Sequence, residues 1–354
     1  MIKATAFLAL NAAAIFLALK AERKALKAAL LAVIMALMLI DLAMFGLPFF
    51  SVADQHTIFA KDEIISAIEA DNGTYRVFDF SNRSNLYSAI ALMHGINLIS
   101  YNSQNLNSEV RFITTAFGVE QKNYNAETNL EPETIRNPSL ISLLNVKYLI
   151  SDAPIMALNT TLAAESGKKR LYKNANYKER AFIAYDVMPL ENEDEVFSRL
   201  KDNSTDYSML ILVEKRPGDR TPELRGGNNR AMNYTVRVMK NSPNEIKISA
   251  STASPGFLFL SEAYAPGWKA SVDGNSNANL YKANGAFMGV FLAEGEHSVE
   301  FNYAPGSFAA GAAISALTAS SILAYYAIFV VLRKKKNSKG KKQRKQPVTT
   351  TRAA

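Results

Sequence analysis

The sequence contains no cysteine, one tryptophan and three histidines among its 354 residues. The absence of cysteine excludes disulfides, zinc sites with thiolate ligands and thiol nucleophiles. The histidines, His56, His94 and His297, lie far apart and form no HxxxH or HExxH pattern, so no metal site is expected. Phosphate-binding loops, dinucleotide-binding fingerprints and the GxSxG motif are also absent from the sequence, which therefore predicts no bound cofactor.

Basic residues exceed acidic residues by eight, and the excess lies at the two ends of the chain. From Arg333 onward the tail holds ten Lys or Arg and no acid, while residues 1–50 hold five basic and two acidic residues. The intervening residues 51–332 therefore carry a net charge of −5. Because this body is mildly acidic, we do not expect it to bind nucleic acid.

Three segments have the length and composition of membrane helices: residues 1–19, 28–50 and 308–332. Each holds roughly the ~20 apolar residues that a bilayer requires. The third begins with small residues (FAAGAAISALTASS), which let membrane helices approach closely. The sequence therefore predicts three transmembrane helices, with a signal peptide as the alternative for the first segment.

The distribution of basic residues predicts the orientation of these helices. The loop KAERKALK between the first two segments and the tail at 333–354 are both basic, and both are expected in the cytoplasm. Residues 51–307 are then extracytoplasmic in a multi-pass protein of the plasma membrane. We also expect membrane lipids to be partners, because a basic tail contacts anionic headgroups.

The extracytoplasmic part shows two patterns in succession. Over residues 55–216, segments typical of strands and helices alternate, which predicts an α/β subdomain. Residues 217–229 are dense in Pro, Gly and charge and predict a linker. Residues 230–306 hold short strands about ten residues apart, which predicts a β-sandwich subdomain. The expected fold class is a membrane-anchored α+β protein, with transmembrane helices on both sides of these subdomains.

The end of this region resembles a known family. The stretches SEAYAPGWKASVDG and NGAFMGVFLAEGEHSVEFNYAPGSF, which run into a membrane helix, resemble the C-terminal portion of the YfhO family of bacterial membrane proteins. Upstream, TYRVFDF and NPSLISLLNVKYLIS resemble the family's exterior domain, and ALMLIDLAMFG resembles its preceding membrane helix. YfhO-like proteins look like GT-C glycosyltransferases. The resemblance therefore implies a polyprenyl-phosphate sugar donor and a glycan acceptor in the cell envelope.

The sequence also differs from the YfhO family in the number of membrane helices. YfhO proteins have many membrane helices before the exterior domain, and GT-C enzymes carry the catalytic acid mainly in the first exterior loop and nearby helices. Those parts have no counterpart here, so no catalytic residue is carried over. We expect a role in envelope-glycan glycosylation that needs a polytopic membrane partner to supply the missing helices. The alternatives are a non-catalytic extracytoplasmic binding or assembly module, and a remnant of a longer protein.

Three ionisable residues are weak catalytic candidates: Asp41, Asp54 and His56. Asp41 lies in the second membrane segment, where a carboxylate is costly and is a functional hypothesis by default. The alternative is a structural polar contact with Asn11 or with a missing helix. Asp54 and His56 follow at the membrane surface, where they are either an acid–base pair or part of a solvated segment.

The single tryptophan lies in EAYAPGWKASVDGN, between a Pro-Gly turn and an Asp-Gly hairpin signal. Trp268 takes the first inward position of the intervening strand, and we interpret it as a core anchor. The alternative is a sugar-stacking platform formed with Tyr264. Five N-x-S/T sequons permit glycosylation without demonstrating it: Asn72, Asn82, Asn159, Asn203 and Asn233.

Overall fold

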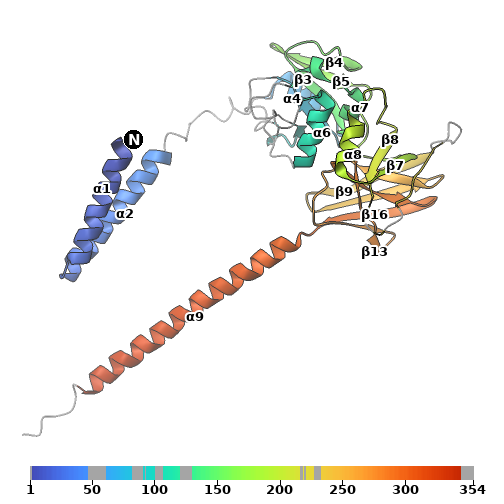
Figure 1. Ribbon diagram of the computed structural model, residues 1–354. Coiled ribbons are helices and arrows are strands. Elements are labelled where there is room, and N and C mark those ends of the chain that lie inside the picture. The colour runs from blue at the N-terminus through green and yellow to red at the C-terminus, as the bar shows by residue number, and fades with distance from the viewer. Residues whose placement is uncertain are drawn as a thin grey trace, which may run out of the picture. The chain divides into compact units, whose positions relative to one another are not determined.

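The computed structural model describes residues 2–46, 61–81, 91, 93–99, 107–119, 130–215, 218, 221–226 and 233–343. The chain divides into two compact units, residues 1–60 and 61–354 (Figure 1).

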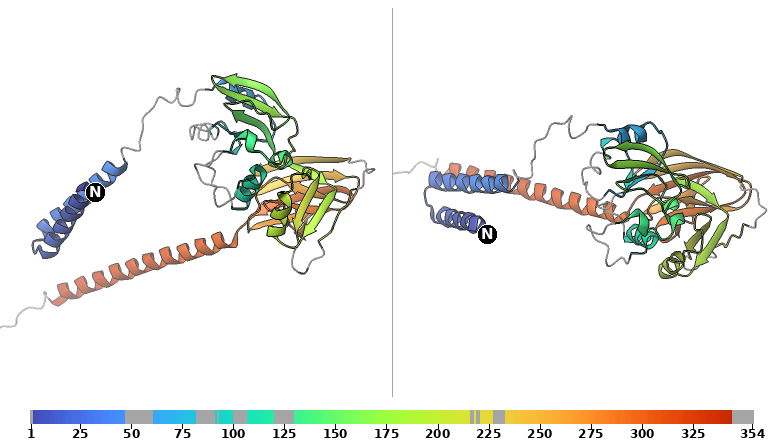
Figure 2. Two further views of the ribbon diagram at one scale, coloured as in Figure 1. Left: turned by 45° about the horizontal axis from the view of Figure 1, so that its top comes forward. Right: turned by 90° about the horizontal axis from the view of Figure 1, so that it is seen from above.

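The first unit is a helical hairpin of α1 (Ile2–Lys20) and α2 (Lys24–Gly46), which lie side by side in Figures 1 and 2. Ala14 and Ala18 are buried, as expected where small residues let two helices approach. Most large apolar side chains of α2 are exposed, including Met35, which is 65% exposed. Such a surface suits an apolar surrounding rather than water.

Two helical segments of the described residues are long and apolar enough to cross a membrane. They are Lys24–Met44, with a mean hydropathy of 2.3, and Gly306–Leu332, with a mean hydropathy of 1.9. They correspond to the second and third predicted segments. Within α1 the described apolar stretch, Leu10–Lys20, is shorter than a membrane span.

The second unit contains a folded domain, residues 61–303, that begins with a mixed five-stranded sheet of order β2-β1-β3-β5-β4. Strand β1 runs parallel to β2 and β3, whereas β5 is antiparallel to β3 and β4. Asn137 caps α7 and Pro138 occupies its first turn, a pair of residues that favours the start of a helix. The elements are α4 (Glu63–Glu69), β1 (Arg76–Asp79), β2 (Leu98–Ile99), α6 (Asn107–Phe117), η3 (Pro132–Thr134), α7 (Pro138–Leu143), β3 (Val146–Ser151), β4 (Thr160–Ser166) and β5 (Lys169–Asn174).

Two further sheets complete the folded domain (Figure 2). One has six strands in the order β6-β11-β15-β14-β8-β7, and the other has five antiparallel strands in the order β13-β12-β16-β10-β9. Their elements are β6 (Ala181–Ala184), β7 (Asp186–Leu190), α8 (Glu193–Leu200), β8 (Leu210–Glu214), β9 (Tyr234–Ser242), β10 (Glu245–Thr252), β11 (Gly256–Leu260), β12 (Trp268–Val272), β13 (Asn275–Ala278), β14 (Tyr281–Ala283), β15 (Phe287–Leu292) and β16 (Gly295–Tyr303).

Hydrophobic burial explains how these two sheets pack. Alternate residues such as Ile248 of β10 and Phe301 of β16 share one buried cluster with Leu258 of β11, so the sheets enclose a common core. The other face of the six-stranded sheet packs against helices. There, the rings of Phe112 in α6 and Phe287 in β15 lie 4.8 Å apart at 79°. The six-stranded sheet is therefore the middle layer of the domain.

The six-stranded sheet crosses the boundary that the sequence indicates between two subdomains. Strands β6, β7 and β8 lie within residues 55–216, yet β6 pairs with β11 and β8 pairs with β14. All four residues of β6 are buried, because the strand is covered on both faces. Burial on both faces removes the alternation that identifies a sheet face in the sequence, so the partner of β6 could not be inferred. In the expected linker, Leu224 forms a bridge with Val187 of β7.

The chain leaves the folded domain through α9 (Gly306–Gln343), a single helix of 38 residues. It contains the predicted span 308–332 and continues into the basic tail.

Candidate functional site

The Pro-Gly turn before Trp268 packs closely against the residues that precede α9. Gly267 has a φ of +116°, and a Cβ built on it would lie 2.9 Å from the Cα of Pro305. The N–H of Ala304 also donates to the carbonyl oxygen of Gly267 at 2.9 Å. Only glycine meets both the backbone angle and the close approach.

The Asp-Gly turn after Trp268 is a tight hairpin, with φ of 52° at Asp273 and 80° at Gly274. The Asp273 carboxylate accepts from the N–H of Ser298 at 2.8 Å and contacts Nδ1 of His297 at 2.7 Å. These two hydrogen bonds, with that of His297 the larger, hold the pKa of Asp273 below its usual value. His297 shares the face of the buried Val299 but lies beyond the core, where its ring supports this turn.

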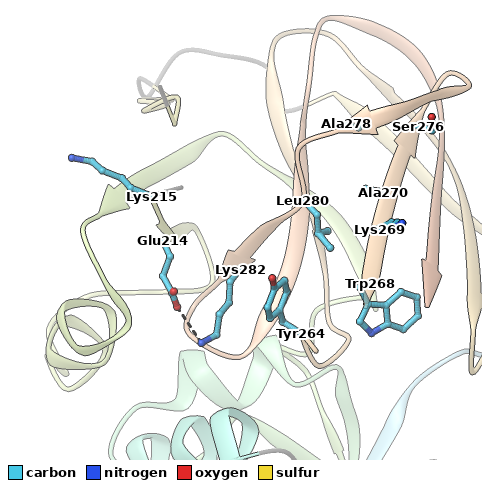
Figure 3. A pocket seen from close by; sticks show the side chains of 10 residues that line it. All are labelled: Glu214, Lys215, Tyr264, Trp268, Lys269, Ala270, Ser276, Ala278, Leu280 and Lys282. Carbon is cyan, nitrogen blue, oxygen red and sulfur yellow. Dashed lines mark ion pairs between the residues drawn. The ribbon is translucent and has the colours of Figure 1, made fainter. Parts of the chain in front are cut away.

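Between the two turns, Trp268 and Tyr264 line one pocket of about 410 Å³ (Figure 3). Both side chains are partly buried and pack against the core between the sheets. The Trp268 ring also lies 5.2 Å from the ring of Tyr303. Trp268 is therefore both a packing residue and part of a pocket wall. The pocket is lined by Glu214, Lys215, Tyr264, Trp268, Lys269, Ala270, Ser276, Ala278, Leu280 and Lys282.

Charged groups converge at the other end of this pocket from Trp268 (Figure 3). The ammonium group of Lys282 lies 2.9 Å from Oε2 of Glu193 and 3.2 Å from Oε1 of Glu214. Burial raises the pKa of Glu214, and the nearby Lys282 opposes that shift. The pocket thus offers two aromatic rings, the partly buried carboxyl group of Glu214 and the ammonium groups of three lysines, Lys215, Lys269 and Lys282. This combination suits a small polar molecule with an apolar face.

Sequence reasoning missed Glu214 and Lys282. They belong to β8 and β14, which are neighbours in the six-stranded sheet, with Val213 opposite Ala283. In the sequence they lie far apart, and neither carries a local signal beyond its charge, at the end of β8 for Glu214 and in the middle of β14 for Lys282. Only the pairing of β8 with β14 brings them together.

The weak catalytic candidates are not brought into this pocket. Asp41 is exposed on α2, whereas Asp54 and His56 lie outside the described residues. In the hairpin, Asn11 lies nine residues before the end of α1 and Asp41 seventeen residues after the start of α2. At ~1.5 Å per residue, their levels along the hairpin differ by about 12 Å, so a direct Asn11–Asp41 contact is not favoured.

The other histidine of the described residues also has a structural position. Nδ1 of His94 lies 2.8 Å from Oε1 of Glu69, beside the left-handed Gly95. Within the described part of the chain, no group of three or more His, Asp or Glu residues is arranged to hold a metal ion.

A second hollow, of about 730 Å³, lies beside the N-terminus of α7. Its lining is mainly amide and hydroxyl side chains and includes the sequon residues Asn159 and Asn203. Asn137, which caps α7, directs its side-chain amide to the carbonyl oxygens of Asp202 and Thr205 at 3.3 and 3.4 Å. The side-chain amide and carbonyl groups of Asn137 therefore form hydrogen bonds within the fold.

Comparison with protein families matches residues 225–315 to the family described as bacterial membrane protein YfhO. The match covers β9 to β16 and the beginning of α9, and it includes both turns, Tyr264 and Trp268. The upstream stretches TYRVFDF and NPSLISLLNVKYLIS lie outside it. No curated protein and no solved structure gives a significant match. Residues 225–315 of the chain are therefore similar to the YfhO family of bacterial membrane proteins.

Proposed function

We propose that the chain is a membrane-anchored protein that binds a cell-envelope glycan in the Trp268 pocket. The observation that carries this proposal is the convergence of Trp268 and Tyr264 on one cavity with charged side chains at its other end. Aromatic rings pack on the apolar faces of sugar rings, while carboxyl and ammonium groups pair with hydroxyl groups. A cavity of about 410 Å³ accommodates one to two sugar rings by the usual size of ligand pockets.

The proposed topology has three membrane spans, at residues 1–19, 28–50 and 308–332. The basic loop between α1 and α2 and the basic tail lie in the cytoplasm, and residues 51–307 lie outside the plasma membrane. In this arrangement the six-stranded sheet and the five-stranded sheet of order β13-β12-β16-β10-β9 form an extracytoplasmic β-sandwich. The two sheets' shared core supports this part of the proposal.

The proposed role is in glycosylation of an envelope glycan from a polyprenyl-phosphate sugar, with a polytopic membrane partner supplying the catalytic groups. Glu214 is the one carboxylate among the described residues that line the pocket, and it is paired with Lys282. Glycosyl transfer to an acceptor hydroxyl requires a free general base, whereas the carboxylate of Glu214 is held by Lys282. The pocket therefore supports recognition rather than catalysis by this chain alone.

The same observation favours a second candidate function, a non-catalytic binding or assembly module. Deletion of the gene separates the two candidates. Loss of sugar substituents from envelope glycans, as in glycosylated teichoic acid, supports the glycosylation role. An unchanged glycan composition contradicts that role and leaves the binding module.

The binding step is tested with the full chain in detergent and an array of envelope oligosaccharides. Trp268→Ala is expected to weaken binding about fivefold, since a stacked ring contributes on the order of 1 kcal/mol. Trp268→Phe keeps an aromatic ring and should retain most of the binding. Thermal unfolding of both variants shows whether the fold survives. If the unsubstituted protein binds no oligosaccharide, glycan recognition by this pocket is wrong.

A further inference from the structure

The Trp268 end of the pocket is joined to the beginning of α9 by direct contacts. Trp268 pairs with Tyr303 across β12 and β16, three residues before α9 begins at Gly306. The preceding residue, Gly267, packs against Pro305, which immediately precedes α9. Trp268 therefore lies within roughly 10 Å of the first residue of this helix, by the spacing of consecutive and paired residues.

The length of the apolar part of α9 places its first residue at a defined depth. Gly306–Leu332 contains 27 residues, which at ~1.5 Å per residue extend for about 40 Å. That length matches a whole bilayer including both headgroup layers, about 40–45 Å, rather than the hydrocarbon core of about 30 Å. A helix that crosses the membrane with this segment has Gly306 in the outer headgroup layer, and Trp268 lies at the same level.

The residues at this level have the chemistry of a membrane interface. Tryptophan and tyrosine are enriched where headgroups meet water, and the rings of Trp268 and Tyr303 lie 5.2 Å apart. Lys269 follows Trp268 and is exposed, and within the described residues it forms no ion pair. An ammonium group at this position suits the phosphates of lipid headgroups. Phe308, in the first turn of α9, is 77% exposed.

We propose that Trp268, Lys269 and Tyr303 form a lipid-contacting edge that docks the folded domain on the headgroup layer of the membrane that α9 crosses. The mouth of the pocket at Trp268 then opens at the lipid surface. A ligand attached to a lipid reaches the pocket without leaving the membrane. The inference rests on the membrane crossing in the proposed function, and it does not depend on glycan binding.

The single tryptophan makes this edge directly measurable. The full chain is reconstituted in phosphatidylcholine–phosphatidylglycerol vesicles that carry a nitroxide either on the headgroup or deep in an acyl chain. We expect the headgroup nitroxide to reduce Trp268 emission more than the deep nitroxide. We also expect acrylamide to quench the emission of Trp268 less in the vesicles than in the unfolded chain, measured without detergent or lipid. Emission that neither nitroxide reduces overturns the proposal.

The matched control moves the tryptophan within the folded domain. Trp268→Phe combined with Met156→Trp places the reporter before β4, at a position that is 84% exposed. Neither nitroxide should quench that variant. Equal quenching at both positions would mean unspecific contact with lipid and would overturn the proposed edge. Lys269→Glu should reduce the headgroup quenching of Trp268 in anionic vesicles, and an unchanged value contradicts the role of Lys269.

Flotation of the vesicles separates failure of this inference from failure of the proposed function. Because the α1–α2 hairpin can itself hold the chain in the vesicles, added protease also tests whether the basic tail and the folded domain lie on opposite sides of the membrane. Protein that floats with these two parts on opposite sides, but whose Trp268 emission neither nitroxide reduces, contradicts only the docking edge. Protein that does not float, or that has both parts on one side, contradicts the membrane crossing of α9, and the docking edge is then wrong as well.

Discussion

At the scale of single residues, Gly267 joins the hairpin of Trp268 to the start of α9. We expect Gly267→Ala to destabilise the folded domain by about 1–3 kcal/mol, because the backbone has a φ of +116° and the new methyl group meets Pro305. Gly274→Ala is the matched control. Gly274 also has a positive φ, of 80°, but a Cβ there would contact nothing within 4 Å.

Thermal unfolding of both variants in the same detergent measures the difference. A cost of Gly267→Ala that is no larger than that of Gly274→Ala would show that the contact with Pro305 contributes nothing to stability.

Asp71 gives a pH dependence whose sign follows from its surroundings. Its carboxylate contacts the ammonium group of Lys147 and accepts from the hydroxyl of Tyr148 at 3.0 Å. The pKa of Asp71 is lowered, mainly because Lys147 donates a hydrogen bond to the carboxylate. A carboxyl group with a lowered folded pKa stabilises the fold above its unfolded pKa and loses that contribution as the pH falls through the folded pKa.

We therefore expect Asp71→Asn to be less stable than the parent chain at pH 7, and the difference to shrink below about pH 4. Denaturant unfolding at several pH values measures this. A difference that is constant from pH 7 to pH 2 would assign the effect to packing instead of charge.

At the scale of elements, the shared core of the two β-sheets predicts which strand positions carry stability. Ile248 of β10 is 1% exposed and lies in the core between the sheets, whereas the next residue, Ser249, is on the exposed face. Ile248→Ala should cost about 2–5 kcal/mol, and Ser249→Ala should change stability by less than about 0.5 kcal/mol. Equal costs at the two positions would contradict the described register of β10.

The strands after residue 230 could be predicted because alternate residues such as Ile246 and Ile248 are buried on one face. The same reasoning could not place β6, whose residues are all buried, or β8, whose partner β14 lies far along the chain. For the candidate site, local turn signals identified the hairpin around Trp268. The carboxyl and ammonium groups of Glu214 and Lys282 depend on strand pairing over long sequence separations, which no local pattern specifies.

At the scale of the whole molecule, the chain joins a helical hairpin, a folded domain and a long C-terminal helix. Asp41 raises the question of whether the chain itself supplies a polar partner for this carboxylate. Asp41 is exposed on α2, inside an apolar segment with a mean hydropathy of 2.3. An unpaired carboxylate is costly inside a membrane helix, and Asp41 lies three residues before the end of this segment at Met44. By the same count Asn11 lies about 12 Å from the level of Asp41, whereas the backbone of Lys3, seventeen residues before the end of α1, lies at that level. The partner of Asp41 is therefore either Lys3 or a group on a helix outside this hairpin.

A partner outside the hairpin predicts opposite effects on insertion and on association. Asp41→Leu should then insert into membranes at least as well as the parent chain, because it removes the carboxylate from an apolar segment. It should also capture less of any membrane protein that chemical cross-linking joins to the parent chain in the source membrane. Met38→Leu, on a neighbouring exposed position of the same helix, is the control and should retain that partner. If Asp41→Leu captures the same membrane protein in the same yield, Asp41 does not mediate the contact, and the carboxylate is satisfied by Lys3 of α1 or by lipid headgroups and water at the membrane surface.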